Sequence, residues 1–264
     1  MPQDAALGIG IGRWWWLAVA TFVIGLVALV PAALLERLIA PNTNMQFAAD
    51  SGTIWSGRGR IRIATGTAPL IVPQTWRFAP GALFGLRLGF NIEPDSPVIS
   101  GTTRIGLRFS DVELSNTALV ADARLLTFAH QAAALFTPAG KVRLQQAGDE
   151  RLRVRPATNT GEAWRVDGVM GLHTEQLAFG GIVNAQVGTH DITLLGDGPT
   201  IKLSVLRSSG PLKLEGGGTL ALALPRRFTF SGFATAANDA PDALKQLGPL
   251  LPDGRQRIEL NTNW

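Results

Sequence analysis

Three histidines are the residues of this chain best suited to metal or acid–base chemistry: His130, His173 and His190. They form no His-x-x-x-His or His-Glu-x-x-His spacing, and the chain has no cysteine, so a metal site would need scattered carboxylates. Histidines that face solvent or are satisfied within the fold are therefore expected, and no metal site is predicted.

Other catalytic patterns are also weak. Asp149 and Glu150 offer two carboxylates, but adjacent residues in a strand or turn point apart, whereas glycoside cleavage needs a defined separation. The glycines of GIGIG, Gly8 to Gly12, follow no strand and so do not predict a dinucleotide-binding loop. The sequence predicts no catalytic residue, no bound cofactor and no enzyme activity.

The charge pattern argues against a nucleic-acid partner. Lys and Arg total 24 against 20 Asp and Glu, a formal net charge of +4, and the basic residues are spread along the chain. Nucleic-acid binders usually cluster their positive charge with interleaved aromatic residues. The absence of cysteine also excludes disulfides and thiolate catalysis.

A membrane anchor is the clearest feature of the N-terminal region. Trp14 to Leu35 is an uncharged run of 22 residues, and about 20 apolar residues cross a bilayer core. Trp14, Trp15 and Trp16 suit the headgroup level, where indole rings are enriched. A cleaved signal peptide is the alternative, because Ala18-Val19-Ala20 offers a small-residue site, but its apolar region is typically about 7–15 residues.

The expected organisation follows from this anchor. Short N-terminal tails with a Lys/Arg bias stay cytoplasmic, and Arg13 supplies that bias here. We expect residues 1–13 to be a short cytoplasmic tail, residues 14–38 a transmembrane anchor, and residues 39–264 a periplasmic β-rich domain. The predicted location is the inner membrane, single-pass, with most of the chain in the periplasm.

Alternation with a period of two dominates the chain after Arg37. Arg58, Arg60 and Arg62 alternate with glycine and isoleucine, and Arg104 and Arg108 do the same in TRIGLRFS. In the longer stretch FGLRLGFNIE, residues 84–93, alternation predicts five apolar side chains on one face and Arg87 on the other. The apolar residues are Phe84, Leu86, Leu88, Phe90 and Ile92. Such segments are typical of half-buried strands, because successive side chains point to opposite faces.

Turn signals separate the strands, among them Pro80-Gly81, Ser100-Gly101 and Asp253-Gly254. They favour a mainly β fold, in which an antiparallel, twisted or curved meander follows the single transmembrane helix. Two short helices are predicted to lie across the apolar face or over an end of the sheet. One spans 122–138 with Asp122 as N-cap, and the other spans 238–252 with Asn238 or Asp239 as cap and Gly248 as stop.

The arginine-bearing face has two interpretations. One wet face is normal for an antiparallel sheet, and this is the favoured view. The alternative is a docking surface for anionic lipid headgroups or an acidic partner. The candidate interaction residues are Arg58, Arg60, Arg62, Arg104 and Arg108.

Three motifs follow one another in the predicted periplasmic part. SGTIWSGR contains Ser51, Gly52, Trp55, Ser56, Gly57 and Arg58; WRFAPGALFG contains Trp76, Pro80 and Gly85; LGPLLPDGRQRIEL contains Gly248, Asp253, Gly254 and Arg255. In this order, after an N-terminal anchor, they resemble the type II secretion system protein N family (general secretion pathway protein N). The sequence departs from that family at His173, near a point where the family tends to carry a tryptophan.

The resemblance implies a non-enzymatic, bitopic inner-membrane component of the Gram-negative machine that moves folded proteins from the periplasm across the outer membrane. Its implied partners are other type II secretion components, on the inner-membrane platform or the outer-membrane secretin side, and membrane lipid. The family's β-rich part is similar in style to AsmA-like lipid-handling proteins. The motif residues would be structural, with Trp55 packing on the apolar face near the membrane end.

Two functions remain open. The sheet edges and arginine face would bind other envelope proteins by strand addition, or the apolar sheet face would form a groove for lipid. A structural sheet should have this face sealed by the two helices and by Phe84, Phe90, Phe109 and Phe136, whereas a lipid-binding protein should leave it open.

Overall fold

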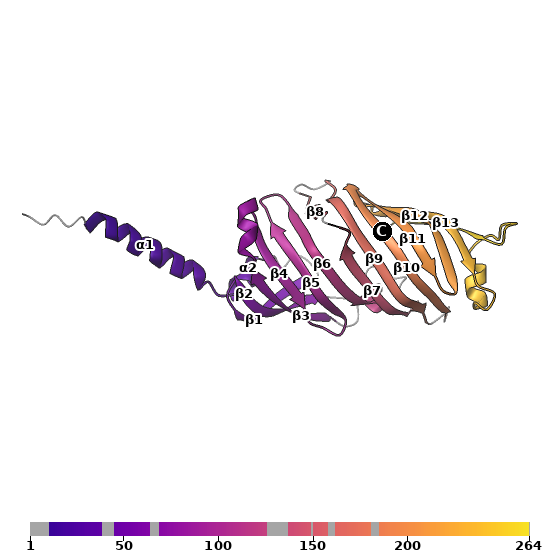
Figure 1. Cartoon of the computed structure of the whole chain (residues 1–264), viewed down its shortest axis with the longest axis horizontal. Coiled ribbons are helices and arrows are strands. Elements are labelled where there is room, and N and C mark those ends of the chain that lie inside the picture. Colours follow the sequence, from indigo (N-terminus) through magenta and orange to yellow (C-terminus); the bar gives the residue numbers. More distant parts are fainter. Residues whose placement is uncertain are drawn as a thin grey trace, which may run out of the picture.

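The computed structural model describes residues 11–38, 45–63, 69–125, 137–148, 150–157, 162–180 and 185–263. One open antiparallel sheet of 14 strands contains nearly all of the described residues that follow the N-terminal helices (Figure 1). The strands are β1 Met45–Gly52, β2 Ser56–Ile63, β3 Leu70–Phe78, β4 Leu88–Pro94, β5 Ile99–Leu107, β6 Val112–Asp122, β7 Pro138–Gln146, β8 Leu152–Arg155, β9 Arg165–Phe179, β10 Ala185–Gly198, β11 Thr200–Ser209, β12 Leu212–Ala221, β13 Arg227–Ala236 and β14 Gln256–Asn263.

The strands follow one another in space as they do in sequence. The order is β1 to β7, then β9 to β14, while the short β8 pairs with both β6 and β9. Every strand pair is antiparallel, as expected when short turns join alternating segments. The predicted mainly β, antiparallel meander is confirmed.

Two helices precede the sheet. Helix α1 (Ile11–Ala28) projects away from the β1 end of the sheet, and α2 (Ala33–Leu38) packs beside β1 (Figure 1). The chain leaves α1 before Pro31, whose ring fixes φ and removes a backbone donor. Leu35 therefore lies in α2, apart from the tryptophans of α1. Over the described residues, no helix is both long and apolar enough to span a membrane.

The two predicted helices take shorter forms. Of residues 122–138, a 3₁₀ turn η2 (Ala123–Leu125) is described, and residues 126–136, with His130 and Phe136, lie outside the described part. The second is a 3₁₀ helix, η4 (Asp242–Gln246), preceded by Pro241, so Asn238 and Asp239 were wrong as caps. Leu244 within this helix is buried, whereas Leu247 follows the end of the helix and is exposed.

The strand predicted from Phe84 begins later than expected. Residues Pro80–Gly85 form a 3₁₀ helix, η1, and Leu86 then adopts a left-handed conformation with φ of 54° before β4 starts at Leu88. Proline at the start of this turn favours helical backbone geometry. As a result Phe84 and Leu86 are exposed, and Arg87 is largely buried, opposite to the alternation read from the sequence.

The apolar face is covered differently along the sheet. Toward the C-terminal end, Ala240 and Leu244 pack over a core of Ala185, Val187, Leu212 and Ala234. Toward the N-terminal end, the same face is hollow. The described η4 segment thus covers the C-terminal half. Phe84 and Phe109 were expected to seal this face, but both are exposed, and Phe90 lines the hollow instead.

Candidate functional site

The segment Ser51–Arg58 joins the N-terminal helices to the sheet. The backbone N–H of Ala32 donates to the Gly52 carbonyl at 3.1 Å, and that of Ile54 donates to the Val30 carbonyl at 3.0 Å. The indole Nε1 of Trp55 donates to the carbonyl of Val27, in the last turn of α1, at 2.8 Å. The motif is therefore the attachment point of α1.

Trp76 explains the glycines of the same motif. Its ring is buried, and its Nε1 donates to the Thr53 carbonyl at 3.2 Å. A Cβ on Gly57 would lie 2.5 Å from the Trp76 ring and 2.4 Å from the Ser51 carbonyl. The Phe47 ring packs edge-to-face against the Trp76 ring, at 5.5 Å between the two centroids. Only glycine leaves room for this tryptophan at position 57.

An apolar trough lies beneath Trp76. It has a volume of about 670 Å³ on the apolar face of β1 to β5, with α2 at one side. Its lining comprises Leu35, Gln46, Phe47, Ile54, Ile61, Gln74, Trp76, Phe90, Ile92, Pro94, Thr103, Ile105 and Leu107. Only three of these side chains carry polar groups besides the Trp76 indole N–H, so the trough suits hydrocarbon.

The predicted interaction arginines lie on the opposite face or at its margin. Arg58, Arg60 and Arg62 alternate with Ile61 along β2, and Arg60 pairs with Asp50 at 2.6 Å. Arg58 lines a polar hollow of about 510 Å³ together with Arg77 and Glu93.

The other two arginines of that set lie further along the sheet. Arg104 Nε donates to Asn91 Oδ1 at 2.8 Å, and an Arg108 guanidinium nitrogen donates to the Gly85 carbonyl at 3.3 Å. All five arginines are exposed. An interaction role for them stays a prediction.

A buried ion cluster was missed by the sequence analysis. Glu113 on β6, with a side chain 6 % exposed, accepts a hydrogen bond from Arg87 at 2.5 Å and forms an ion pair with Arg151 at 3.1 Å. Arg153 lies 3.9 Å from the same carboxylate. Glu113 and its partners come from three separate parts of the chain, so no local spacing could have indicated the cluster. It lines a hollow of about 180 Å³ beneath η1.

The C-terminal motif shapes the end of the sheet. A Cβ on Gly248 would lie 2.0 Å from the Arg257 carbonyl, and Gly254 has φ of +80°, so both positions require glycine. Asp253 accepts hydrogen bonds from the backbone and guanidinium of Arg255, which lower the pKa of that carboxyl. Arg255 in turn lies over the Phe233 ring at 4.5 Å. The motif therefore fixes the turn that leads into β14.

The described histidines have structural partners. His173 Nδ1 lies 2.5 Å from Asp191 Oδ1, and His190 Nδ1 lies 2.8 Å from Ser208 Oγ. His190 is buried, and this burial lowers its pKa although Asp191 opposes the shift. Within the described parts of the chain, no group of three or more His, Asp or Glu residues could hold a metal ion.

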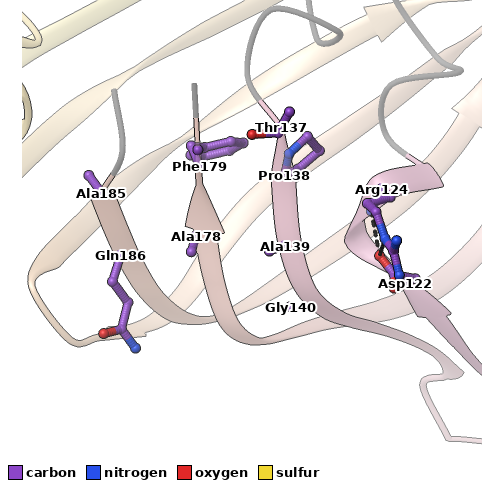
Figure 2. Close-up of a pocket in the computed structure, with 11 residues that line it drawn as sticks. Asp122, Arg124, Thr137, Pro138, Ala139, Gly140, Ala178, Phe179, Ala185 and Gln186 are labelled. Carbon is purple, nitrogen blue, oxygen red and sulfur yellow. Dashed lines mark hydrogen bonds and ion pairs between the residues drawn. The ribbon is translucent and has the colours of Figure 1, made fainter. Parts of the chain in front are cut away.

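Another hollow, of about 500 Å³, lies where β6 and β9 end and β7 and β10 begin. Figure 2 shows Asp122 and Arg124 joined on one side, with Pro138 and Phe179 across the hollow. The hydrogen bond from the Arg124 side chain lowers the pKa of Asp122. These two are its charged lining residues, and they neutralise each other. The described lining therefore offers no catalytic group.

A model of the type II secretion system protein N family matches residues 43–259. The chain belongs to this family. No curated protein and no solved structure matches it.

The protein N match runs from just before β1 into β14, so it covers nearly the whole sheet. Membership makes the chain a component of the type II secretion system and makes other components of that system its expected partners. The family is a part of secretion machinery and is not known for enzyme activity.

Proposed function

We propose that this protein N is a non-enzymatic, inner-membrane-anchored component of the type II secretion machinery, with its sheet in the periplasm, and that it binds another component by strand addition at β14. The anchor is residues 14–38 and the cytoplasmic tail is residues 1–13. The uncharged run from Trp14 to Leu35 supports the anchor, as does the exposure of Trp15 and Trp16 on α1.

The observation that carries strand addition is the open edge of β14. Its N-terminal part is covered, because Arg257 N–H donates to the Pro249 carbonyl on the outer side. In an antiparallel strand the N–H and C=O of one residue point to the same edge of the strand, and those of the next residue point to the opposite edge. The N–H and C=O groups of Glu259, Asn261 and Asn263 therefore point outward, as those of Arg257 do. In the described chain, β14 pairs only with β13 beyond this point.

The other edge of the sheet is covered. The outer side of β1 carries α2, and the Ala49 N–H donates to Glu36 Oε1 at 2.7 Å. Open sheet edges are templates for pairing with another chain, and proteins usually block the ones they do not use. The contrast between the two edges favours β14 as the binding edge.

The binding edge lies far from the anchor. Helix α1 leaves one end of the sheet and β14 forms the other (Figure 1). Neighbouring strands lie about 4.8 Å apart, so thirteen strands in sequence extend roughly 60 Å before twist is counted. The sheet would present β14 to a partner well away from the membrane.

A proline at Asn261 tests this function. Asn261→Pro removes an outward N–H without deleting a hydrogen bond to β13, so the thermal transition should stay unchanged while partner binding falls. A photo-reactive amino acid at Leu260 of the full chain, in cells with an active system, should cross-link to another secretion component. The cross-link should weaken at least fivefold in Asn261→Pro.

Two controls sharpen the result. Asn261→Ala keeps the N–H and should retain the cross-link, and the photo-reactive group at the exposed Ser204 of β11 should give none. An undiminished cross-link in Asn261→Pro, or equal cross-linking from position 204, would overturn strand addition at β14.

A further inference from the structure

The trough beneath Trp76 has an opening to solvent at one end of the strands. Leu88 on β4 is the direct neighbour of Leu107 on β5, on the same face as Phe90 and Ile105, which line the trough. Leu88 and Leu107 are both partly exposed. The apolar lining therefore continues from the interior to the strand ends.

An exposed apolar rim lies at this opening. Phe109, in the turn after Leu107, is fully exposed. The hydrogen bond from Arg108 to the Gly85 carbonyl brings this turn beside η1, which packs on the opposite face of the sheet, over Gly89. Phe84 and Leu86 are exposed there and lie outside the rim. Exposed apolar clusters of this kind usually mark a binding or membrane-contact surface.

The rim lies at the same end of the strands as the attachment of α1. The β1–β2 turn with Trp55, the end of β3, η1 and the β5–β6 turn all meet there. Trp55 donates a hydrogen bond to Val27 of α1, and its ring packs edge-to-face against Phe78 at 5.1 Å between centroids. The rings of Phe78 and Phe90 pack in the same way at 5.8 Å between centroids. A continuous row of apolar rings thus leads from the end of α1 to the trough.

The chemistry of the lining selects the occupant. A peptide in the trough would bring backbone N–H and C=O groups that need partners, and burying them unpaired is costly. The side-chain polar groups of the lining are the amides of Gln46 and Gln74, the Thr103 hydroxyl and the Trp76 N–H, and two of these are engaged. Thr103 pairs with Thr117, and Trp76 donates to Thr53. A hydrocarbon chain needs no such partners.

We propose that the trough holds an acyl chain of a membrane lipid, which enters over the rim formed by Leu88, Leu107 and Phe109. The trough volume falls within the range of about 300–1,000 Å³ typical of small-ligand sites. Supply of lipid rests on the proposed anchor, which keeps the rim beside the bilayer.

Photolabelling in vesicles tests the proposal. The full chain would be reconstituted in vesicles of phosphatidylethanolamine and phosphatidylglycerol containing phosphatidylglycerol with a diazirine near the end of one acyl chain. After illumination, the labelled peptides are identified by mass spectrometry. We expect label on Phe47, Ile61 or Trp76, which lie inside the trough, in addition to label on α1.

Filling the trough supplies the matched variants. Ile105→Trp should reduce label on the interior residues at least fivefold and leave label on α1 unchanged, whereas Leu260→Trp on β14, outside the trough, should change neither. If Ile105→Trp loses its thermal transition, Gln74→Trp takes its place.

The readouts separate the two proposals. Label on α1 without label inside the trough overturns the acyl-chain site and leaves the anchor intact, as expected if a protein segment fills the trough. Label inside the trough that Ile105→Trp and Gln74→Trp fail to reduce also overturns it. Label inside the trough without label on α1 overturns the anchor alone.

Discussion

The indole nitrogen of Trp55 lies 2.8 Å from the carbonyl oxygen of Val27, to which it donates a hydrogen bond across 28 positions of sequence. Carbonyls in the last turn of a helix have no partner within the helix, so an outside donor stabilises them. Together with the backbone bonds at Ala32 and Ile54, this contact fixes how α1 meets the sheet.

Trp55→Phe tests this junction. A smaller aromatic ring remains but the indole donor is lost, so the free energy of unfolding should fall by at least about 1 kcal/mol. The orientation of α1 should become less uniform. Because the chain has no cysteine, spin labels on Ala20→Cys and Ser204→Cys report the distance, and its distribution should broaden in Trp55→Phe. An unchanged distribution would show that the backbone bonds alone hold the helix.

Trp76→Ala should be more damaging than Trp55→Ala. Trp76 is 6 % exposed and fits against Gly57 and Phe47, so its removal should cost about 3–5 kcal/mol by urea unfolding. Trp55 is only half-buried, and its loss should cost less. Equal costs for the two variants would contradict the packing described here.

Glu113→Gln should show how much the buried ion cluster contributes to the free energy of unfolding. The substitution leaves Arg87 without its carboxylate partner, a loss of about 3–5 kcal/mol for a buried pair. Glu175→Gln is the matched control, because its pair with Arg143 is partly exposed and should contribute at most about 1 kcal/mol. Chemical denaturation of both variants measures the difference, and similar losses would count against the cluster.

His190 should make stability depend on pH. Burial lowers the pKa of His190 in the fold, so the unfolded chain binds the proton first as the pH falls below about 6.5. The stabilisation is therefore complete above that pH and declines as the pH falls toward the folded-state pKa. Thermal melts from pH 7.5 to pH 5 should show a smaller decrease in His190→Gln than in the unsubstituted chain. Parallel decreases would argue that another group is responsible.

The rim should contact the bilayer surface. An environment-sensitive dye on Phe109→Cys of the full chain should shift its emission to the blue when the chain is reconstituted in vesicles with anionic lipid. The same dye on Ser204→Cys should show no shift. If the dye emission is unshifted at both Phe109→Cys and Ser204→Cys, the rim does not contact the membrane.

Much of the fold was predictable because it depends on local alternation. The arginine–isoleucine alternation of Arg58 to Ile63 placed β2, since side chains of a strand point alternately to its two faces. The prediction failed at Phe84, where Pro80 begins a 3₁₀ turn that shifts the following strand. The alternation of apolar residues could not reveal this turn, because apolar residues occur at regular intervals in both a 3₁₀ helix and a strand.

The sequence by itself determined the antiparallel meander, the apolar N-terminal run and the family motifs, because each rests on residues close together in the chain. Only the tertiary structure decided that Trp55 bonds to Val27, that Glu113 gathers Arg87 and Arg151, and that the apolar face is covered at one end and hollow at the other. These features depend on the curvature of the sheet and on contacts between distant strands, which no local pattern encodes.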